Sequence, residues 1–286
     1  MDFGNVITAM VTPFDENLAV NWSQVEPLIN YLIDEQLSDG LVICGTTGES
    51  PTLSDEEKLK LIEASVRYAR GRCKIIAGTG GNDTAHTIHF SQKVEKLGVD
   101  ALLVVAPYYN RPSQEGLYQH FKAVAEAVKL PVVLYNVPGR TGVNIDADTT
   151  IRLSQISKIV ATKDCAGTNQ LTRILSGVGE GFHVYSGEDA NTLPALAVGC
   201  RGIISVASHV IGKEMQTMIK YYLAGNNQQA AEMHRKLLPV FTGIFQAPSP
   251  APIKYALKLK GIDTGGVRLP LIEVNEHERQ FIRSLF

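Results

Sequence analysis

The chain has 286 residues, of which 44% are hydrophobic and 20% charged, a composition typical of a folded globular protein with a sizeable core. The formal net charge is −2 and no basic cluster occurs, which argues against nucleic acid or a membrane surface as a partner and favours small molecules. The stretch MDFGNVITAMV lacks the features of a secretory signal, and no apolar run approaches the ~20 residues that span a bilayer. We therefore expect a cytoplasmic protein.

The pattern of the four cysteines is also typical of a cytoplasmic protein. Cys44, Cys73, Cys165 and Cys200 lie singly in apolar segments, and no C-x-x-C pair occurs. Because cysteine is among the most often buried residues, we expect reduced core thiols rather than disulfides or zinc ligands.

Eight short apolar runs, rich in β-branched residues, recur along the chain, and each is followed by a stretch with the apolar spacing of a helix. In chain order the runs are NVITAMVTPF, DGLVICGTT, CKIIAGTGG, DALLVVAPY, PVVLYNVPG, IVATKDCAG, FHVYSGED and RGIISVASH. Helix starts carry capping signals, such as Ser54 with Glu57 three residues later, and Asp83 before the third helix. Glycines such as Gly98 and Gly225 end helices. Strand and helix therefore alternate.

This alternation predicts an α/β fold of the (β/α)8 TIM barrel type. The runs show little internal alternation of polarity, as strands buried on both faces do, and eight of them suit a closed barrel better than an open doubly wound sheet. We place the catalytic barrel at residues 1–225 and a small C-terminal helical domain at residues 226–286. Helical segments are expected there around 227–246, 249–260 and 274–286. No low-complexity linker separates the two parts.

In such barrels the chemistry lies where the strands end, because the following loops converge there. In GTTGES, residues 45–50, the glycines let backbone N–H groups approach an anion, and Thr46 and Thr47 add hydroxyls. The lysine of a phosphate-binding P-loop is absent, and GTGGND at 78–83 is no dinucleotide fingerprint. His86 and His89 have a spacing that suits a metal, but they lie on an amphipathic helix without other ligands, so no metal is expected.

Aromatic and basic residues follow the fourth and fifth runs. Tyr108 and Tyr109 precede a rigid polar loop, where paired aromatics more often serve a site or an interface than a core. Tyr135 lies on the strand face shared by alternate residues, so it is either a proton-exchanging phenol inside the barrel or an interior tyrosine bonded to backbone. Arg140 is suited to bind a carboxylate or phosphate, although a surface salt bridge is the commoner use of a loop arginine.

The sixth run, IVATKDCAGT at 159–168, carries a lysine into the apolar interior. Side chains alternate along a strand, so Ala161, Lys163 and Cys165 share one face and Asp164 lies on the other. A buried cation is costly unless it is paired, neutral or useful, so Lys163 belongs either to a structural ion pair or to a Schiff-base nucleophile. Asp164 should not reach Lys163 within that strand.

Five motifs together resemble the dihydrodipicolinate synthase family, which belongs to the superfamily of pyruvate-dependent class I aldolases that includes N-acetylneuraminate lyase. The motifs are GTTGES at 45–50, PYYNRP at 107–112, YNVPGRTG at 135–142, the IVATKDCAG lysine and SGED at 186–189. The resemblance is to the bacterial type and covers essentially the whole chain. It implies a lyase of the diaminopimelate route to lysine, which condenses pyruvate with L-aspartate 4-semialdehyde to 4-hydroxy-tetrahydrodipicolinate. It also implies a homotetramer built from tight dimers.

The resemblance assigns the proton chemistry to four residues. Lys163 is implied to form the Schiff base with pyruvate, and Tyr135 to be the central proton shuttle. Thr46 links Tyr135 to Tyr109, which in this family reaches in from the neighbouring subunit. Since a protonated imine acts as the electron sink, no metal or other cofactor is expected.

The resemblance also implies the substrate contacts. Thr46 and Thr47 would hold the pyruvate carboxylate, Arg140 would hold the semialdehyde carboxylate, and the main chains of Gly187 and Ile204 would shape the pocket. After the lysine the family more often has Glu-Ala or Glu-Cys, where this chain has Asp164 and Cys165.

Two other functions stay open at this stage. A sibling lyase that cleaves a sugar acid such as N-acetylneuraminate would share the lysine, the tyrosine and GTTGE, but it resembles YNxP followed by small apolar residues where this chain has Arg140. A non-catalytic barrel that senses a metabolite would not need the complete set of relay residues.

A degenerate effector site is also expected. Lysine-sensitive members of the family bind the end product at the tight-dimer interface, and the corresponding positions here are Ser50, Pro51, Asp55, Lys58, Asn82, His86 and Tyr108. Sensitive members tend to have histidines in place of Asp55 and Lys58 and glutamate in place of His86. Loss of that glutamate and gain of Lys58 remove attraction for an amino group, so we expect little inhibition by lysine.

Overall fold

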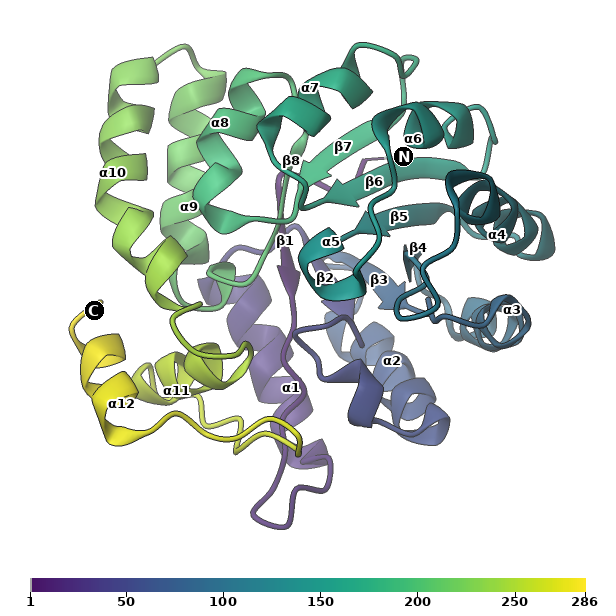
Figure 1. The fold of residues 1–286 in the computed structure, drawn as a ribbon. Coiled ribbons are helices and arrows are strands. Elements are labelled where there is room, and N and C mark those ends of the chain that lie inside the picture. Colours follow the sequence, from purple (N-terminus) through teal and green to yellow (C-terminus); the bar gives the residue numbers. More distant parts are fainter. Residues whose placement is uncertain (1) are drawn as a thin grey trace.

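Eight parallel strands form a closed barrel in which each strand pairs with its neighbours in the sequence and β1 pairs with β8 (Figure 1). The computed structural model describes residues 2–286. The strands are β1 (Val6–Ala9), β2 (Gly40–Ile43), β3 (Lys74–Gly78), β4 (Ala101–Val105), β5 (Val132–Asn136), β6 (Ile159–Asp164), β7 (His183–Ser186) and β8 (Gly202–Ser205). Each lies within one of the eight apolar runs, so the predicted fold class is confirmed.

Helices surround the barrel. They are α1 (Trp22–Asn30), α2 (Asp55–Ala69), α3 (Thr84–Val94), α4 (Gln114–Ala127), α5 (Pro138–Thr141), α6 (Ala147–Leu153), α7 (Thr168–Leu175), α8 (Thr192–Ala197), α9 (Ser208–Leu223), α10 (Asn227–Gly243), α11 (Ala251–Leu259) and α12 (Glu276–Arg283). A π-helical turn at Tyr31–Glu35 and 3-10 turns at Ser50–Thr52, Glu95–Leu97 and Asp189–Asn191 complete them. No helix of residues 2–286 is long and apolar enough to cross a membrane.

Local signals fix the helix ends. The side chain of Ser54 accepts a hydrogen bond from the Glu57 N–H, and Glu57 in turn accepts from the Ser54 N–H, which is the predicted capping box of α2. Asp83 caps α3 through the N–H groups of Ala85 and His86. Because these bonds satisfy N–H groups that a helix start leaves open, they fix where each helix begins after its strand.

Alternating side chains fill the barrel interior. The interior cluster includes Ala9, Val42, Ile76, Leu103, Val133, Tyr135, Ala161, Tyr185 and Ile204. The intervening strand residues, such as Leu134 and Ile203, belong to the larger core between strands and helices. This two-residue period decides which side chains can reach the reaction centre.

The predicted helical appendage is also confirmed, and it contacts the opposite end of the sequence. Helix α10 packs on α9, and α11 packs on α9 and α12. After α11 the chain runs beside the loop that joins β1 to α1 (Figure 1), where the Phe14 N–H donates to the Thr264 carbonyl at 3.0 Å and Arg268 donates to the Leu18 carbonyl at 2.8 Å. The C-terminal segment therefore lies close to the loops that follow β1 and β2. The boundary at residue 225 stays a prediction.

Candidate active site

Lys163 lies on β6 with its side chain in the barrel, and only 5% of the residue is exposed. Asp164 is on the other face, as predicted, where its carboxylate accepts hydrogen bonds from Asn136 (2.9 Å), Gln170 (2.7 Å) and the Ala166 N–H (2.7 Å). Burial raises the pKa of Asp164, although these three donors oppose that shift. The ion pairs within residues 2–286 do not include Lys163. The structural ion pair with Asp164 is therefore not formed.

The neighbouring strand places a phenol against this lysine. Tyr135 on β5 pairs in register with Lys163, and the Lys163 Nζ lies 4.5 Å from the centre of the Tyr135 ring. The Tyr135 hydroxyl is 3.5 Å from the Thr46 hydroxyl, at the long end of hydrogen bonding. Apo sites often have such loose contacts, which shorten when substrate binds. Tyr135 thus contacts Lys163 through its ring and Thr46 through its hydroxyl.

Gly187, after β7, leaves the space that the lysine side chain occupies. A Cβ at this position would lie 2.3 Å from the Cys165 sulfur and 2.9 Å from the Lys163 Cε, so any other residue would force the Cys165 or the Lys163 side chain to shift. Burial raises the pKa of the Cys165 thiol to about 12, which keeps the thiol uncharged beside the lysine. Ile204 on β8 is 1% exposed and belongs to the interior cluster.

The GTTGES loop is a tight turn whose own bonds limit what it offers an anion. The N–H groups of Gly48 and Ser50 donate to the Gly45 carbonyl, and the Glu49 N–H donates to the Thr46 carbonyl. The N–H groups of Gly48, Glu49 and Ser50 are therefore not free for an anion, and Thr46 and Thr47 are the residues of the motif that could meet one. Thr46 is half-buried and Thr47 is buried.

A cavity of about 350 Å³ brings Thr46, Tyr135 and Arg140 together. Arg140 lies in the short helix α5 directly after β5, is exposed, and forms no ion pair with residues 2–286. A guanidinium without a counterion at the mouth of a cavity is suited to receive a carboxylate. Lys163 lies behind Tyr135 rather than in the cavity lining.

The expected effector residues lie next to this cavity. Ser50, Pro51, Lys58, His86 and Tyr108 line it. Asp55 lies between two of them, 3.6 Å from the Lys58 ammonium and 3.7 Å from His86 Nε2. Asn82 joins the group by donating to the Tyr108 carbonyl at 3.3 Å. The expected effector residues therefore lie together along one part of the cavity.

Tyr109 is the predicted site residue that the single chain does not bring to the others. It is 90% exposed, and its φ of +73° is in the left-handed region, which is uncommon for a tyrosine. Its N–H donates to the Thr141 carbonyl at 3.4 Å. A large aromatic held outside its own chain is available to a neighbouring molecule.

Sequence reasoning missed two buried carboxylates around the site, Asp189 and Glu49. Asp189 is buried after β7 and accepts hydrogen bonds from Ser205 (2.5 Å), the Val206 N–H (3.1 Å) and the Ala207 N–H (3.0 Å), which join the ends of β7 and β8. Glu49 is buried within GTTGES. The available signal was that each acid stands inside a quoted motif, SGED or GTTGES, although their partners could not be read from it.

Comparison with known proteins identifies the lineage of this site. The model of the Dihydrodipicolinate synthetase family matches residues 2–286. The chain belongs to this family. Family membership confirms the resemblance seen in the five motifs.

Members of the dihydrodipicolinate synthetase family with curated names match the chain over nearly its full length. It is 52% identical over 286 residues to a 4-hydroxy-tetrahydrodipicolinate synthase of Bacillus velezensis, covering 100% of this chain and 99% of the relative. It is 54% identical over 288 residues to one of Listeria innocua, covering 100% and 98%.

Solved structures of the family agree. Dihydrodipicolinate synthase from Bacillus anthracis has a TM-score of 0.98 at 51% identity, covering 100% of this chain and 98% of that one. The enzyme from Cyanidioschyzon merolae, solved with lysine bound, has a TM-score of 0.97 at 42% identity, covering 99% and 97%.

Proposed function

We propose that the barrel condenses pyruvate with L-aspartate 4-semialdehyde to give 4-hydroxy-tetrahydrodipicolinate, as a lyase of the diaminopimelate route to lysine. The observation that carries the proposal is the buried Lys163, which forms no ion pair with residues 2–286 and is in register with Tyr135, a residue that lines the same cavity as Arg140. The names of relatives at 52% and 54% identity support the same reaction.

The chemistry begins at the amine. The Lys163 amine attacks the keto carbon of pyruvate, water leaves, and the protonated imine then loses a methyl proton to become an enamine. Its carbon attacks the aldehyde of the semialdehyde and forms the new carbon–carbon bond. The amino group of the semialdehyde then attacks the imine carbon, which closes the ring and frees Lys163.

Each proton transferred in these reaction steps needs a carrier close to the imine. Tyr135 is adjacent to Lys163, and Thr46 lies next to Tyr135, so a proton can pass along this line toward solvent. Tyr109 of a second copy would complete the relay. The subunits would assemble as a homotetramer of tight dimers, in the cytoplasm and without a cofactor.

The substrate contacts follow from the two carboxylates. Thr46 and Thr47 would hold the carboxylate of pyruvate, and Arg140 would hold that of the semialdehyde. The main chains of Gly187 and Ile204 would form the pocket wall beside the imine.

Borohydride reduction in the presence of pyruvate, followed by peptide mass mapping, tests the central step. We expect a pyruvate-derived adduct on Lys163 and none in Lys163→Ala. An adduct elsewhere, or none in the wild-type protein, would contradict the proposal. Turnover of pyruvate with the semialdehyde, and none with N-acetylneuraminate, separates this function from a sugar-acid lyase and from a metabolite sensor.

A further inference from the structure

We propose that Glu49 is a positioning residue for pyruvate, and that the C-terminal segment holds it in place through Lys254 and Arg268. The inference rests on the proposed function, because it concerns the loop that presents Thr46 and Thr47. It extends that function to a part of the chain that touches neither substrate.

Both oxygens of the Glu49 carboxylate are bound by residues more than 200 positions away in the sequence. Glu49 Oε1 lies 2.8 Å from the Lys254 ammonium, and the two side chains are 1% and 3% exposed. Glu49 Oε2 accepts the Arg268 N–H at 2.9 Å. The backbone of Glu49 has a φ of +56°, an uncommon conformation for a glutamate. A strained turn with a buried charge persists only where its surroundings hold it.

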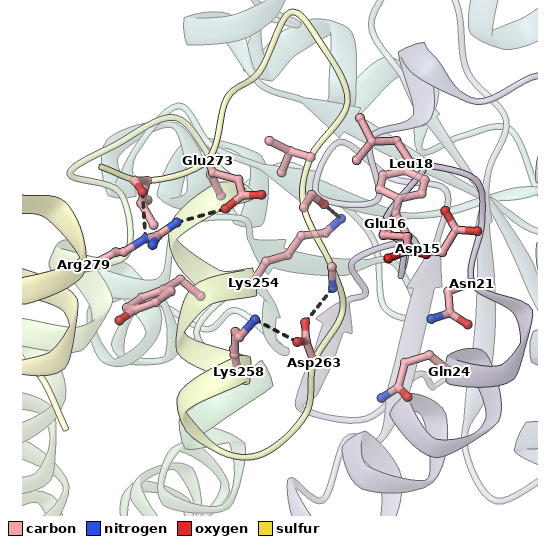
Figure 2. Close-up of a pocket in the computed structure, with 17 residues that line it drawn as sticks. Asp15, Glu16, Leu18, Asn21, Gln24, Lys254, Lys258, Asp263, Glu273 and Arg279 are labelled. Atoms are coloured by element: carbon pink, nitrogen blue, oxygen red, sulfur yellow. Dashed lines mark hydrogen bonds and ion pairs between the residues drawn. The ribbon is translucent and has the colours of Figure 1, made fainter. Parts of the chain in front are cut away.

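Lys254 is fixed from several sides. It extends from α11 and donates to the Gly266 carbonyl at 2.6 Å, at the edge of the cavity shown in Figure 2. Its ammonium is 4.2 Å from the centre of the Phe14 ring, and the Arg268 guanidinium is 4.5 Å from that centre. Burial lowers the pKa of Lys254 to about 8, while Glu49 opposes that shift. Glu49 thus favours the charged form of this buried amine.

The turn links the position of Glu49 to that of Thr46, which lies next to Tyr135. The Glu49 N–H donates to the Thr46 carbonyl at 3.1 Å, and the hydroxyl of Thr46 faces that of Tyr135. From the loop after β1, the Thr12 hydroxyl donates to the Gly48 carbonyl at 2.6 Å and holds the other side of the turn. A shift of Glu49 therefore moves Thr46 and Thr47 relative to the imine.

The surrounding cavity does not itself call for a ligand. Its volume is about 670 Å³, and four of its charged side chains are paired with each other, Lys258 with Asp263 and Arg279 with Glu273, as Figure 2 shows. The Lys258 and Asp263 side chains are 61% and 58% exposed, in contrast to the buried pair of Lys254 and Glu49. The buried pair of Lys254 and Glu49, together with the Arg268 N–H, connects this region to the reaction centre.

Steady-state kinetics of the full-length variant Lys254→Met test the inference. We expect the KM for pyruvate to rise by about tenfold to a hundredfold, as small displacements of positioning groups do, while the KM for the semialdehyde changes by less than about twofold. Loss of a purely structural contact would lower the melting temperature and the active fraction but leave both KM values unchanged. The matched control is Lys258→Met, one turn later on α11, which should keep the wild-type pyruvate KM.

An unchanged pyruvate KM in folded Lys254→Met would overturn the inference. If that variant does not fold, Glu49→Gln, which keeps the shape of the side chain, takes its place, with the same expected rise and the same contradicting result. Wild-type protein is measured first. Absence of turnover and of the Lys163 adduct there would overturn the proposed function, whereas normal wild-type activity with unchanged variants would overturn only the role of Glu49.

Discussion

At the scale of single residues, the site separates the group that bonds to substrate from the group that moves protons. Lys163 supplies the amine, and the phenol of Tyr135 lies on the adjacent strand with its ring 4.5 Å from that amine. The packing role of Tyr135 belongs to its ring and the proton-transfer role to its hydroxyl, so a substitution that removes only the hydroxyl tests the second role separately.

Tyr135→Phe keeps the ring and removes the hydroxyl. We expect turnover to fall by about 10²–10⁴, the usual contribution of a general acid or base, with an unchanged circular dichroism spectrum. Initial rates with saturating pyruvate and semialdehyde measure the effect. Near-normal activity would show that the proton travels by another route.

Arg140→Ala removes the guanidinium at the cavity mouth. Because Arg140 makes no ion pair within residues 2–286, its loss should leave the fold intact, and the borohydride-trapped pyruvate adduct should still form. The KM for the semialdehyde should rise by about tenfold to a hundredfold, as expected when a charge-assisted contact worth about 1.5–3 kcal/mol is lost. If adduct formation fails as strongly as semialdehyde use, Arg140 binds pyruvate instead.

At the scale of elements, the C-terminal segment is bound to the start of α2 as well as to the GTTGES loop. The Arg268 guanidinium donates to both oxygens of Glu57 at 2.6 and 3.0 Å and to the Thr52 carbonyl at 2.7 Å. Hydrogen bonding to Arg268 is the largest cause of the lowered pKa of Glu57. The pair should therefore stabilise the contact between α2 and the C-terminal segment.

Glu57→Gln tests this contact while keeping the capping box, which a glutamine also forms. A lowered carboxyl pKa contributes stability that is present above the unfolded value of 4.5 and is lost as pH falls through the folded pKa. We expect the variant to lose about 1–2 kcal/mol at neutral pH, and the difference from wild type to shrink below pH 4.5. Urea unfolding at one protein concentration measures it. Exposed Glu56→Gln is the control, and an equal loss there would contradict the role of Arg268.

The sequence predicts the strands and their interior residues, but it does not predict the partners of Glu49 and Glu57, and the difference has a physical reason. The interior positions of Lys163 and Tyr135 follow from a two-residue period, which is local, and the eight strands follow from local apolar runs. The partners of Glu49 and Glu57 come from a segment more than 200 residues later, and no local pattern encodes such pairs. Lys254 stands on an apolar face of α11 without any nearby acid in the sequence, which is a signal of burial but not of its partner.

At the scale of the whole molecule, the effector site bears on regulation by the end product. A relative from Cyanidioschyzon merolae was solved with lysine bound. In this chain the Asp55 carboxylate already lies beside Lys58 and His86. The amino group of an effector would therefore lie near the Lys58 ammonium, which repels it. Each lost charge-assisted contact is worth roughly 1.5–3 kcal/mol.

We therefore expect little inhibition by millimolar L-lysine. Initial rates over a lysine titration at sub-saturating pyruvate measure this, with the double variant Lys58→His, His86→Glu as the matched comparison that should gain sensitivity. Half-inhibition of the wild type below about a millimolar, a binding free energy near −4.1 kcal/mol, would show that other contacts serve the site.

The proposed relay makes each reaction centre shared between two chains. Tyr109 is 90% exposed and separate from Thr46 in its own chain, so its proposed role requires a partner. Tyr109→Phe and Lys163→Ala should each be nearly inactive alone. In a hybrid dimer one of the two sites then contains both intact residues, so co-expression at equal levels should restore about a quarter of wild-type activity. Lys163→Ala mixed with Tyr135→Phe is the control, because these residues lie on adjacent strands of one chain and every hybrid site lacks one of them. Recovery in the control, or none in the first mixture, would place Tyr109 outside the relay between subunits.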